Sequence, residues 1–426
     1  MSGMIAIIGT LDTKGDQVEY LKTIIEENGH KTCVIDVGVV GKPLIRPDVS
    51  HEQVAEACGS NLEEIVALND PNAAMVKMAE GASEILKDLL SSRELDGVLA
   101  LGGSMATALS LQVIKVLPIG IPKLIITTVA HSAAITPDMV GGQDLMIIPW
   151  VAGLWGLNSL AKKSLETAAG AISGAVETCK QKAGSLRKVV GVTSLGGTVS
   201  SYMNQLKPAL EVRGYEVAVF HMTGMSGRVF EKTISDGLIE ASLDLSVGVE
   251  LVNQVAGGVC TSGEKRLEAA GKMGIPQIVS PGALEAFHWG KDRPFPAKYI
   301  DRPRHQHNEL LLVVRSSVSE IAAAGQLMAK KLNMSTGPTA VVIPMGGIGE
   351  LPAPKQDERM SEAHQSRLAF RKTLSRLTPE GLKAFHKSLV KNIKPEIRVI
   401  TLEAGINDPP YTQTILELFD EMVSGE

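Results

Sequence analysis

Two turns that combine glycine with hydroxyl side chains carry the strongest chemical signal in the sequence. Each turn follows a short apolar run, residues 5–8 or 98–101, and precedes a segment whose apolar residues have helical spacing. The turns contain Gly9, Thr10, Asp12, Thr13 and Lys14, and Gly102, Gly103, Ser104 and Thr107. Glycine lets the backbone approach a ligand, and N–H groups at a helix start bind phosphate oxygens. The turns therefore predict a phosphate site; the alternative is a pair of tight turns without a ligand.

The first turn also supplies charged groups that suit a nucleotide. Lys14 could neutralise phosphate charge, and Asp12 could hold Mg²⁺ directly or through water. The turn is not a Walker A loop, because the G-x-x-x-x-G-K-[ST] spacing is absent. In the second turn, Ser104 is expected to cap a helix over residues 104–116.

Polar residues at other predicted strand ends extend the set of candidates. Thr128 ends a predicted strand and His131 follows it, while His221 and Arg228 follow the predicted strand 216–220 in the second half of the chain. Arg228 is either a clamp for a carboxylate or phosphate, or a loop arginine paired with a local acid. His131, His221 and Arg228 are the catalytic candidates.

The pair His305-x-His307, with Glu309 nearby, has the spacing of residues that share one face of a strand. Both imidazoles could therefore reach one metal ion. Spacing implies no third ligand, so a pair of hydrogen-bonded or interface histidines is the other interpretation.

Composition limits the classes of function. The 426 residues exceed one typical core, and the net charge of −5 gives no electrostatic footprint for nucleic acid or an anionic membrane. The four cysteines are widely separated, which is typical of reduced cytosolic thiols, and no signal peptide or membrane span is expected. No G-x-S-x-G elbow or G-x-G-x-x-G after a strand is present, which disfavours an α/β-hydrolase and a nicotinamide dehydrogenase. A cytoplasmic protein is predicted.

Alternating strands and helices predict an α/β fold with mostly parallel sheets. The segment after residue 183 resembles a second copy of the first half, with strands at 188–193 and 216–220, a helix at 199–213 and another at 263–272. Two tandem Rossmann-like domains, residues 1–183 and 184–426, are therefore expected, with a ligand in the cleft between them.

The motifs together resemble a known family. Besides the two turns, the sequence contains Leu117-Pro-Ile-Gly-Ile-Pro-Lys123, Phe220-His-x-Thr-Gly224 with Gly227-Arg228, Gly282-Ala-Leu284, His305-x-His-Asn-Glu309 and Ile406-Asn-Asp-Pro409. In this order they are similar to the Tm-1-like ATP-binding family, UPF0261, over residues 4 to about 420. The resemblance implies two Rossmann-like subdomains, ATP and Mg²⁺ on the first, and a homodimer or higher homo-oligomer. The plant member carries a further C-terminal TIM-barrel-like domain, which this sequence is expected to lack.

The sequence departs from the family pattern near the expected site. Met105 and Ala106 stand where the family often has two further glycines, and His131 stands where it has serine. Gly153 replaces a carboxylate and Gly405 replaces a histidine. Larger side chains beside a phosphate cradle narrow it, so a different ligand is possible.

Two functions follow as hypotheses. The first is a cytosolic ATP- and Mg²⁺-binding enzyme that acts on a small anionic metabolite. The second is a non-catalytic, nucleotide-regulated module that binds protein partners. ATP turnover distinguishes them.

Overall fold

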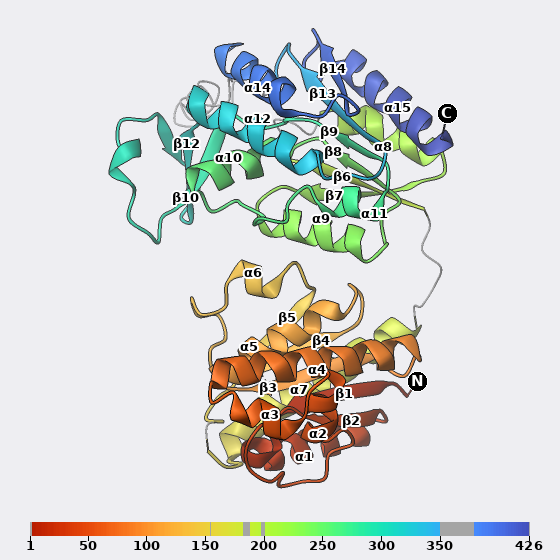
Figure 1. The fold of residues 1–426 in the computed structure, drawn as a ribbon, viewed down its shortest axis with the longest axis vertical. Coiled ribbons are helices and arrows are strands. Elements are labelled where there is room, and N and C mark those ends of the chain that lie inside the picture. The colour runs from red at the N-terminus through yellow and green to blue at the C-terminus, as the bar shows by residue number, and fades with distance from the viewer. Residues whose placement is uncertain (1, 154, 182–187, 197–200, 350–378, 426) are drawn as a thin grey trace, which may run out of the picture. The chain divides into compact units, whose positions relative to one another are not determined.

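The protein divides into two compact units, Met1–Ser185 and Leu186–Glu426, and each has its own sheet (Figure 1). This computed structural model describes residues 2–153, 155–181, 188–196, 201–349 and 379–425. The predicted boundary after residue 183 lies outside the described residues. The prediction of an α/β fold with mostly parallel sheets is confirmed, because every strand pair in the two main sheets is parallel.

The N-terminal unit is built on a five-stranded sheet in the order β2-β1-β3-β4-β5. Its strands are β1 (Met4–Gly9), β2 (Lys31–Asp36), β3 (Gly97–Gly102), β4 (Lys123–Thr127) and β5 (Leu145–Pro149). All six residues of β3 are buried. Such apolar strands, covered on both faces, are typical of parallel sheets.

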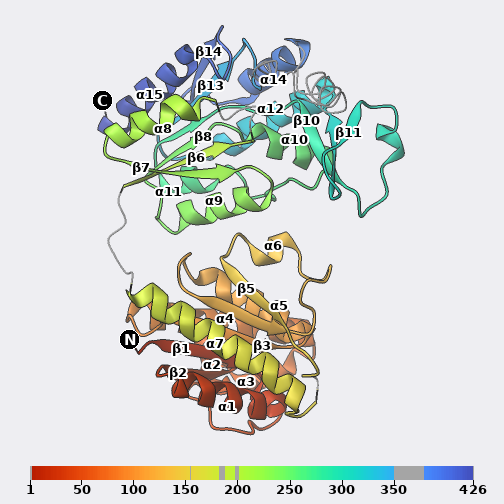
Figure 2. The same cartoon turned by 180° about the vertical axis from the view of Figure 1, so that it is seen from behind.

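Helices cover both faces of this sheet. They are α1 (Leu11–Glu27), α2 (His51–Ala57), α3 (Leu62–Ala67), α4 (Pro71–Ser91), α5 (Ser104–Val113), the 3₁₀ turn η1 (Ile114–Val116), α6 (Pro137–Val140) and α7 (Ser159–Gln181). The apolar sides of α1 and α7 pack on one face, and those of α2, α4 and α5 pack on the other. Helix α7 lies in front of the sheet in Figure 2, which shows the side opposite to α4.

The C-terminal unit contains a six-stranded sheet in the order β14-β13-β9-β8-β6-β7. Its strands are β6 (Val189–Ser194), β7 (Glu216–His221), β8 (Ala241–Asp244), β9 (Gln277–Val279), β13 (Thr339–Pro344) and β14 (Arg398–Leu402). The first five strands in chain order repeat the arrangement of the N-terminal sheet, with β6 in the place of β1 and β8 in the place of β3. The internal repeat in the sequence therefore corresponds to a repeated strand order.

The helices of this unit again pack on both faces. They are α8 (Met203–Val212), α9 (Met225–Ser235), α10 (Gly248–Ala256), α11 (Ala269–Met273), the 3₁₀ turn η2 (Ala297–Tyr299), α12 (Val318–Leu332), α14 (Pro379–Asn392) and α15 (Pro409–Ser424). Helices α8 and α15 cover one face, and α10, α12 and α14 cover the other. The predicted helix 263–272 is wrong in extent, because only Ala269–Met273 is helical. Helices α9 and α10 were not predicted from the sequence.

A small antiparallel sheet is inserted between β9 and β13. It has the order β10-β12-β11, with β10 (Ala286–Gly290), β11 (Arg304–Gln306) and β12 (Leu311–Arg315). Phe287, Trp289 and Val314 pack from one face of it into the core beside α10 and α12.

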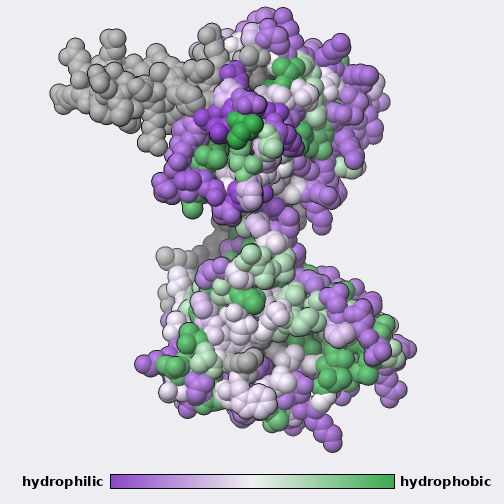
Figure 3. Space-filling model, turned by 90° about the vertical axis from the view of Figure 1, so that its left-hand side faces the viewer, coloured by the Kyte–Doolittle hydropathy of each residue, from purple (hydrophilic) through white to green (hydrophobic). Residues whose placement is uncertain are grey.

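Hydrophobic and hydrophilic residues are interspersed on the face of the molecule shown in Figure 3. Large apolar side chains that stand exposed in the N-terminal unit include Trp155 at 91% and Val40 at 65%. No described helix combines the length and the apolar composition needed to cross a bilayer.

Candidate functional site

The strand order of the N-terminal unit places a topological switch point between β1 and β3. From β1 the chain passes through α1 to β2 on one side, and the later connection from β2 brings β3 to the other side of β1. In open α/β sheets the loops that leave two such strands diverge toward opposite faces, so a crevice is expected at the carboxyl ends of β1 and β3. Ligands of open α/β sheets bind in this crevice. Both glycine-containing turns predicted from the sequence flank it.

Asp36, the last residue of β2, accepts hydrogen bonds that fix the loop after β1. Its Oδ1 accepts hydrogen bonds from the backbone N–H of Leu11 at 3.1 Å and of Gly38 at 2.9 Å. Asp36 is 1% exposed, and its Oδ2 lies 3.6 Å from His51 Nδ1. The first amide of α1 is therefore occupied by a protein carboxylate, and Asp36 is a support for the loop.

The polar side chains of this loop project from the first turn of α1. Thr10 is the N-cap residue, and its Oγ1 lies 3.0 Å from Thr13 Oγ1. A side chain at Gly41 would come within 3.0 Å of Asp12, so the carboxylate lies against the loop that follows β2. The two threonine hydroxyls thus form a polar pair at the strand end, with Asp12 on the β2 side.

Lys14 extends along the sheet edge to the residue that follows β5. Its Nζ lies over the indole of Trp150, 5.4 Å from the ring centroid. Burial lowers the pKa of Lys14, and the nearby Asp12 carboxylate opposes this shift. A partly desolvated ammonium attracts phosphate more strongly than one in open solvent, because the surrounding dielectric is lower.

The loop after β3 is shaped by two glycines. Gly102 has φ +159°, and a Cβ there would lie 2.2 Å from the Cβ of Ala106. Gly103, and not Ser104 as predicted, is the N-cap of α5, and no side chain caps this helix. A Cβ at Gly103 would meet only Thr128 Oγ1, at 3.9 Å, within the distance of a van der Waals contact. The start of α5 therefore borders open space on its ligand side.

Thr107 lies beneath this loop. It is 2% exposed, and its Oγ1 donates to Gly103 O at 2.8 Å and lies 2.6 Å from Thr127 Oγ1. These bonds hold α5 against β4, so the Thr107 hydroxyl fixes the glycine turn and does not face the crevice.

The loop after β4 adds exposed polar groups beside Gly103. Thr128 is exposed, and its backbone N–H donates to Gly102 O at 3.4 Å. His131 is also exposed and has φ +56°, a left-handed conformation that non-glycine residues seldom adopt. The first position of α5 is occupied by the exposed Ser104, and Met105 next to it is 46% exposed. The structure thus brings Thr10, Gly103, Ser104 and Thr128 to the ends of three adjacent strands.

At the matching switch point of the C-terminal unit, described side chains form hydrogen bonds between the ends of β6 and β8. Thr193 Oγ1 donates to Asp244 Oδ1 at 2.8 Å and accepts from the backbone N–H of Ser246 at 3.0 Å. Tyr202 OH donates to Thr193 O at 2.6 Å and lies 3.1 Å from Ser246 Oγ. These hydrogen bonds join the two strand ends through side chains, whereas the loop after β3 in the N-terminal unit has Gly102 and Gly103.

Arg228 lies in the first turn of α9 and not in a loop. It is 9% exposed, and its guanidinium donates to the carbonyl oxygen of Thr261. This hydrogen bond ties α9 to the segment that contains Thr261. His221 is the last residue of β7 and is exposed.

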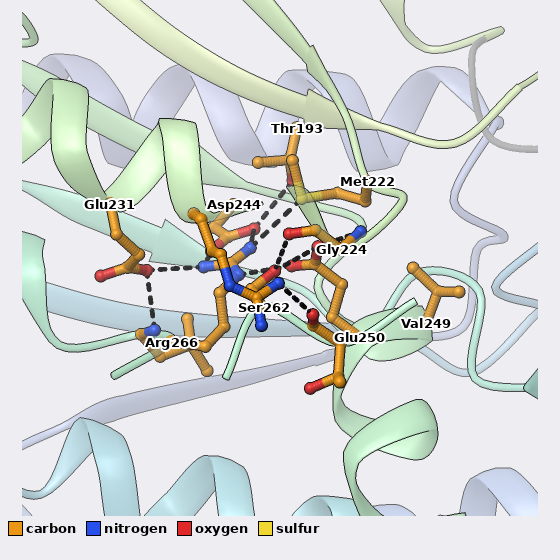
Figure 4. A network of polar contacts seen from close by, with 12 residues as sticks. Thr193, Met222, Gly224, Glu231, Asp244, Val249, Glu250, Ser262 and Arg266 are labelled. Atoms are coloured by element: carbon orange, nitrogen blue, oxygen red, sulfur yellow. Dashed lines mark hydrogen bonds and ion pairs between the residues drawn. The ribbon is translucent and has the colours of Figure 1, made fainter. Parts of the chain in front are cut away.

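A buried charge network centred on Arg266 joins α9, β8 and α10 (Figure 4). The guanidinium contacts Asp244 at 2.5 and 2.8 Å, Glu250 at 2.5 Å and Glu231 at 2.9 Å. Glu250 also accepts from Ser262 Oγ and from the backbone N–H of Gly224. Burial disfavours the charged guanidinium, but the three carboxylates outweigh it and hold the pKa of Arg266 above its ordinary value.

The histidine pair is the remaining metal candidate. His305 lies in β11 and its ring centroid is 6.1 Å from that of His307. Among the residues that the structure describes, no three His, Cys, Asp or Glu side chains are grouped so that they could share a metal ion.

Several residues that shape these regions were missed by the sequence analysis. Asp36 and Asp244 each end a strand, and an acidic residue at a strand end was a usable signal. Arg266 and Trp150 gave no signal, because their roles depend on partners that are distant in the chain.

Comparison with known proteins identifies the family. The model described as "Uncharacterised protein family (UPF0261) N-terminal domain" matches residues 3–182, and that of the C-terminal domain matches residues 187–423. A UPF0261 protein of Brucella suis is 36% identical over 423 residues, which cover 99% of this chain and 96% of the relative. A UPF0261 protein of Clostridium tetani is 37% identical over 353 residues, or 83% of this chain and 86% of the relative.

More distant similarities were also found. The ToMV resistance protein Tm-1 of Solanum lycopersicum is 29% identical over 435 residues, which cover 97% of this chain and 55% of that protein. The crystal structure of MurG from Acinetobacter baumannii covers 99% of this chain and 100% of that chain at 13% identity with a TM-score of 0.21, which is too low to bear on the fold. Both domain models match in order and almost end to end, so the chain belongs to the UPF0261 family.

Proposed function

We propose that the N-terminal unit binds the phosphates of ATP at the switch point between β1 and β3. The observation that carries the proposal is the contrast between the two repeated sheets. The strand ends of β1 and β3 are bordered by Gly103, where a Cβ would meet only Thr128, whereas side-chain hydrogen bonds of Thr193 and Tyr202 join the chain at the ends of β6 and β8.

The described residues around the β1–β3 crevice suit a triphosphate. The N-terminal amides of α5, beginning at Ser104, carry the partial positive charge of a helix start, which favours an anion. The hydroxyls of Thr10, Thr13 and Thr128 can donate to phosphate oxygens, and Lys14 supplies a positive charge. Asp12 would hold Mg²⁺ jointly with the phosphates.

Substitution of Gly103 tests this assignment. A Cβ at position 103 fits the protein but enters the space before α5, so Gly103→Ala should weaken MgATP binding more than tenfold, which equals a loss of about 1.4 kcal/mol. The melting temperature should change little, because φ is −80° and no atom is displaced. Isothermal titration calorimetry provides the affinity. Undiminished affinity in Gly103→Ala would show that the phosphates bind elsewhere.

Catalysis is a separate proposal. An enzyme that uses ATP on a small anionic metabolite needs a group that moves a proton, and His131 is the candidate on the loop beside Thr128. The contacts at the strand ends are made mostly by hydroxyls and amides, which hold phosphate without attacking it. This composition favours the alternative of a nucleotide-regulated module that binds protein partners. Release of inorganic phosphate by the wild type, and its loss in His131→Ala, would support the enzyme.

A further inference from the structure

The loop between β10 and β11 concentrates positive charge in a chain that is negative overall. Residues 289–304 contain five lysines and arginines and two aspartates, so this segment has a net charge of +3, whereas the whole chain has −5. The loop stands away from the six-stranded sheet, at the end of the C-terminal unit that carries β10 and β11 (Figure 2). An anion that approaches this end of the unit therefore meets an excess of positive charge.

Three aromatic rings form the base of the loop. The ring centroids of Trp289, Phe295 and Tyr299 lie 6.2 to 6.3 Å from one another. Trp289 Nε1 donates to Pro294 O at 3.2 Å, and Tyr299 OH donates to Ala256 O at 2.9 Å, which fixes the loop to the end of α10. Three prolines in the same segment restrict its backbone further. The loop therefore presents its charged side chains from a restrained backbone.

Two arginines lie over two of these rings. The guanidinium carbon of Arg293 is 4.9 Å from the Trp289 centroid, and that of Arg304 is 5.0 Å from the Phe295 centroid. Both arginines are exposed, and one N–H group of Arg304 donates to Ile300 O. A guanidinium stacked on a ring keeps the other N–H groups at its edge, where they can donate to both oxygens of a carboxylate. Stacking also limits the rotamers that binding would have to freeze.

Two further cations lie over Tyr299, and their surroundings differ. The Nζ of Lys298 and the Cζ of Arg302 are each 4.6 Å from its ring centroid. Arg302 forms an ion pair with Glu320 at 2.5 Å, so it attaches the loop to α12. Lys298 is exposed, and no carboxylate among the described residues pairs with it. Lys298 therefore joins the two stacked arginines as a cation that a partner can reach.

Exposed apolar and acidic side chains stand among these cations. Ile300 in the loop is 53% exposed, and Leu310 in the turn between β11 and β12 is 72% exposed. The backbone N–H of Lys291 donates to Leu310 O at 3.0 Å, which places this turn beside the loop. Asp292 and Asp301 are exposed as well. The surface thus offers separate positive charges with apolar contacts between them.

We propose that this loop binds an acidic segment of a protein partner, in which carboxylates flank an apolar side chain. The carboxylates would pair with Arg293, Lys298 and Arg304, and the apolar side chain would lie against Ile300. Anionic lipids present charge continuously and would be repelled by the two aspartates of the loop, which separate carboxylates of a peptide can avoid. Stacking of nucleic-acid bases is disfavoured, because cations already lie over the three rings. The surface belongs to the C-terminal unit and does not require nucleotide binding by the N-terminal unit.

Fluorescence anisotropy of a labelled peptide, with glutamates on both sides of a central leucine, tests the proposal on the full chain. The peptide should bind at low ionic strength, and added sodium chloride should weaken binding because exposed charges are screened. The same peptide with glutamine in place of every glutamate should not bind. Equal affinity for the two peptides, or an affinity that is independent of salt, would overturn the proposal.

Variants of exposed residues test whether binding occurs at the loop. Arg293→Gln, Arg304→Gln and Lys298→Gln should each weaken binding of the glutamate peptide by about fivefold, the upper range for a pair of exposed charges. Circular dichroism should show an unchanged fold in all three variants. The matched control is Arg398→Gln, which removes the same charge from an exposed arginine of β14 that pairs with Glu421, and it should bind as the wild type does.

Two outcomes would refute the proposed surface. The first is an equal loss of affinity in the control and in the loop variants, because it would reflect net charge alone. The second is failure of the peptide to bind while phosphatidylserine vesicles bind, or while sedimentation shows self-association that Arg293→Gln abolishes. The occupant would then be a membrane or a second copy of this chain.

Discussion

Glu285 is a carboxyl whose burial gives the C-terminal unit a measurable pH dependence. It precedes β10, is 8% exposed, and its Oε2 has no hydrogen-bond partner among the described residues. Burial raises the pKa of Glu285 to about 8, although a hydrogen bond from its own backbone and the nearby Arg315 oppose the shift. The side chain is therefore protonated and neutral in the folded protein at pH 7.

The expected consequence is a loss of stability as the pH rises through this pKa. Between its ordinary value of 4.5 and about 8, the folded protein keeps a proton that the unfolded chain has released, so raising the pH favours unfolding. Glu285→Gln cannot lose this proton. Its melting temperature relative to the wild type should rise steadily from pH 5 to pH 8 and level off above it, as differential scanning calorimetry would record. A constant difference across this range would contradict the raised pKa.

At the same scale, the sequence predicted which residues reach the strand ends better than it predicted what they do. Thr10, Ser104 and Thr128 are at the β1–β3–β4 edge as expected. Thr107 and Arg228 were also expected at a ligand site. Both side chains are instead buried, and each donates a hydrogen bond to a backbone carbonyl of the protein. Burial depends on partners that are distant in the chain, such as Thr127 and Thr261, and no local spacing reveals them.

At the scale of elements, α9 depends on a glycine that no local rule would require. Gly227 lies in the first turn of α9 at a place where a Cβ would be 2.0 Å from Ser262 Oγ and 2.3 Å from Glu250 Oε2. The absence of a side chain lets the helix start approach the carboxylate that bonds Arg266. The position of α9 and the geometry of the Arg266 network therefore depend on each other.

Gly227→Ala should destabilise the C-terminal unit by about 3 kcal/mol or more, because it overpacks the site and displaces a buried carboxylate from its cation. Chemical denaturation should show the change as a lower midpoint. The matched control is Gly170→Ala in α7, where a Cβ meets nothing within 4 Å. That substitution should stabilise its unit by about 0.5–1 kcal/mol, since alanine favours a helix interior. A loss of stability in Gly170→Ala would instead indicate that α7 packs on another copy of the chain.

Periodicity predicted the long elements of the N-terminal unit well and those of the C-terminal unit less well. Helices α1 and α5 follow the two turns, where the sequence has apolar residues at helical spacing. The segment around α9 and α10 was not recognised, because the N-cap residue of α9 is Gly224 with φ +92° and α10 begins without a side-chain cap. The antiparallel pairing of β10, β11 and β12 also had no turn signal that separated it from the parallel strands.

At the scale of the whole molecule, two sheets with separate cores should behave as separate cooperative units. The N-terminal unit buries its own apolar clusters, and the C-terminal unit buries others. A ligand stabilises only the unit that binds it. The two repeated strand orders therefore allow nucleotide binding to be assigned to one of them by calorimetry of the intact chain.

We expect MgATP at one hundred times its dissociation constant to stabilise the N-terminal unit by about 2.7 kcal/mol. For a unit of this size the shift corresponds to roughly 5–10 °C in one unfolding transition, with the other unchanged. In Gly103→Ala, an affinity that is tenfold weaker should reduce this stabilisation to about 1.4 kcal/mol at the same ATP concentration, which is about half the shift of the wild type. If ATP moved the second transition instead, the nucleotide would belong to the C-terminal unit.

The parallel strand order also sets when each part of the chain can fold during synthesis. Ile5 pairs with Gly97, so the central pair β1–β3 must wait until both segments have left the ribosome. Loop closure over such a distance is slow, and parallel sheets share this property. All five strands of the N-terminal sheet are nevertheless complete at Pro149, before β6 begins at Val189. The first sheet can thus form while the second is still being translated, and the similar strands of the repeat have little opportunity to pair with the wrong partner.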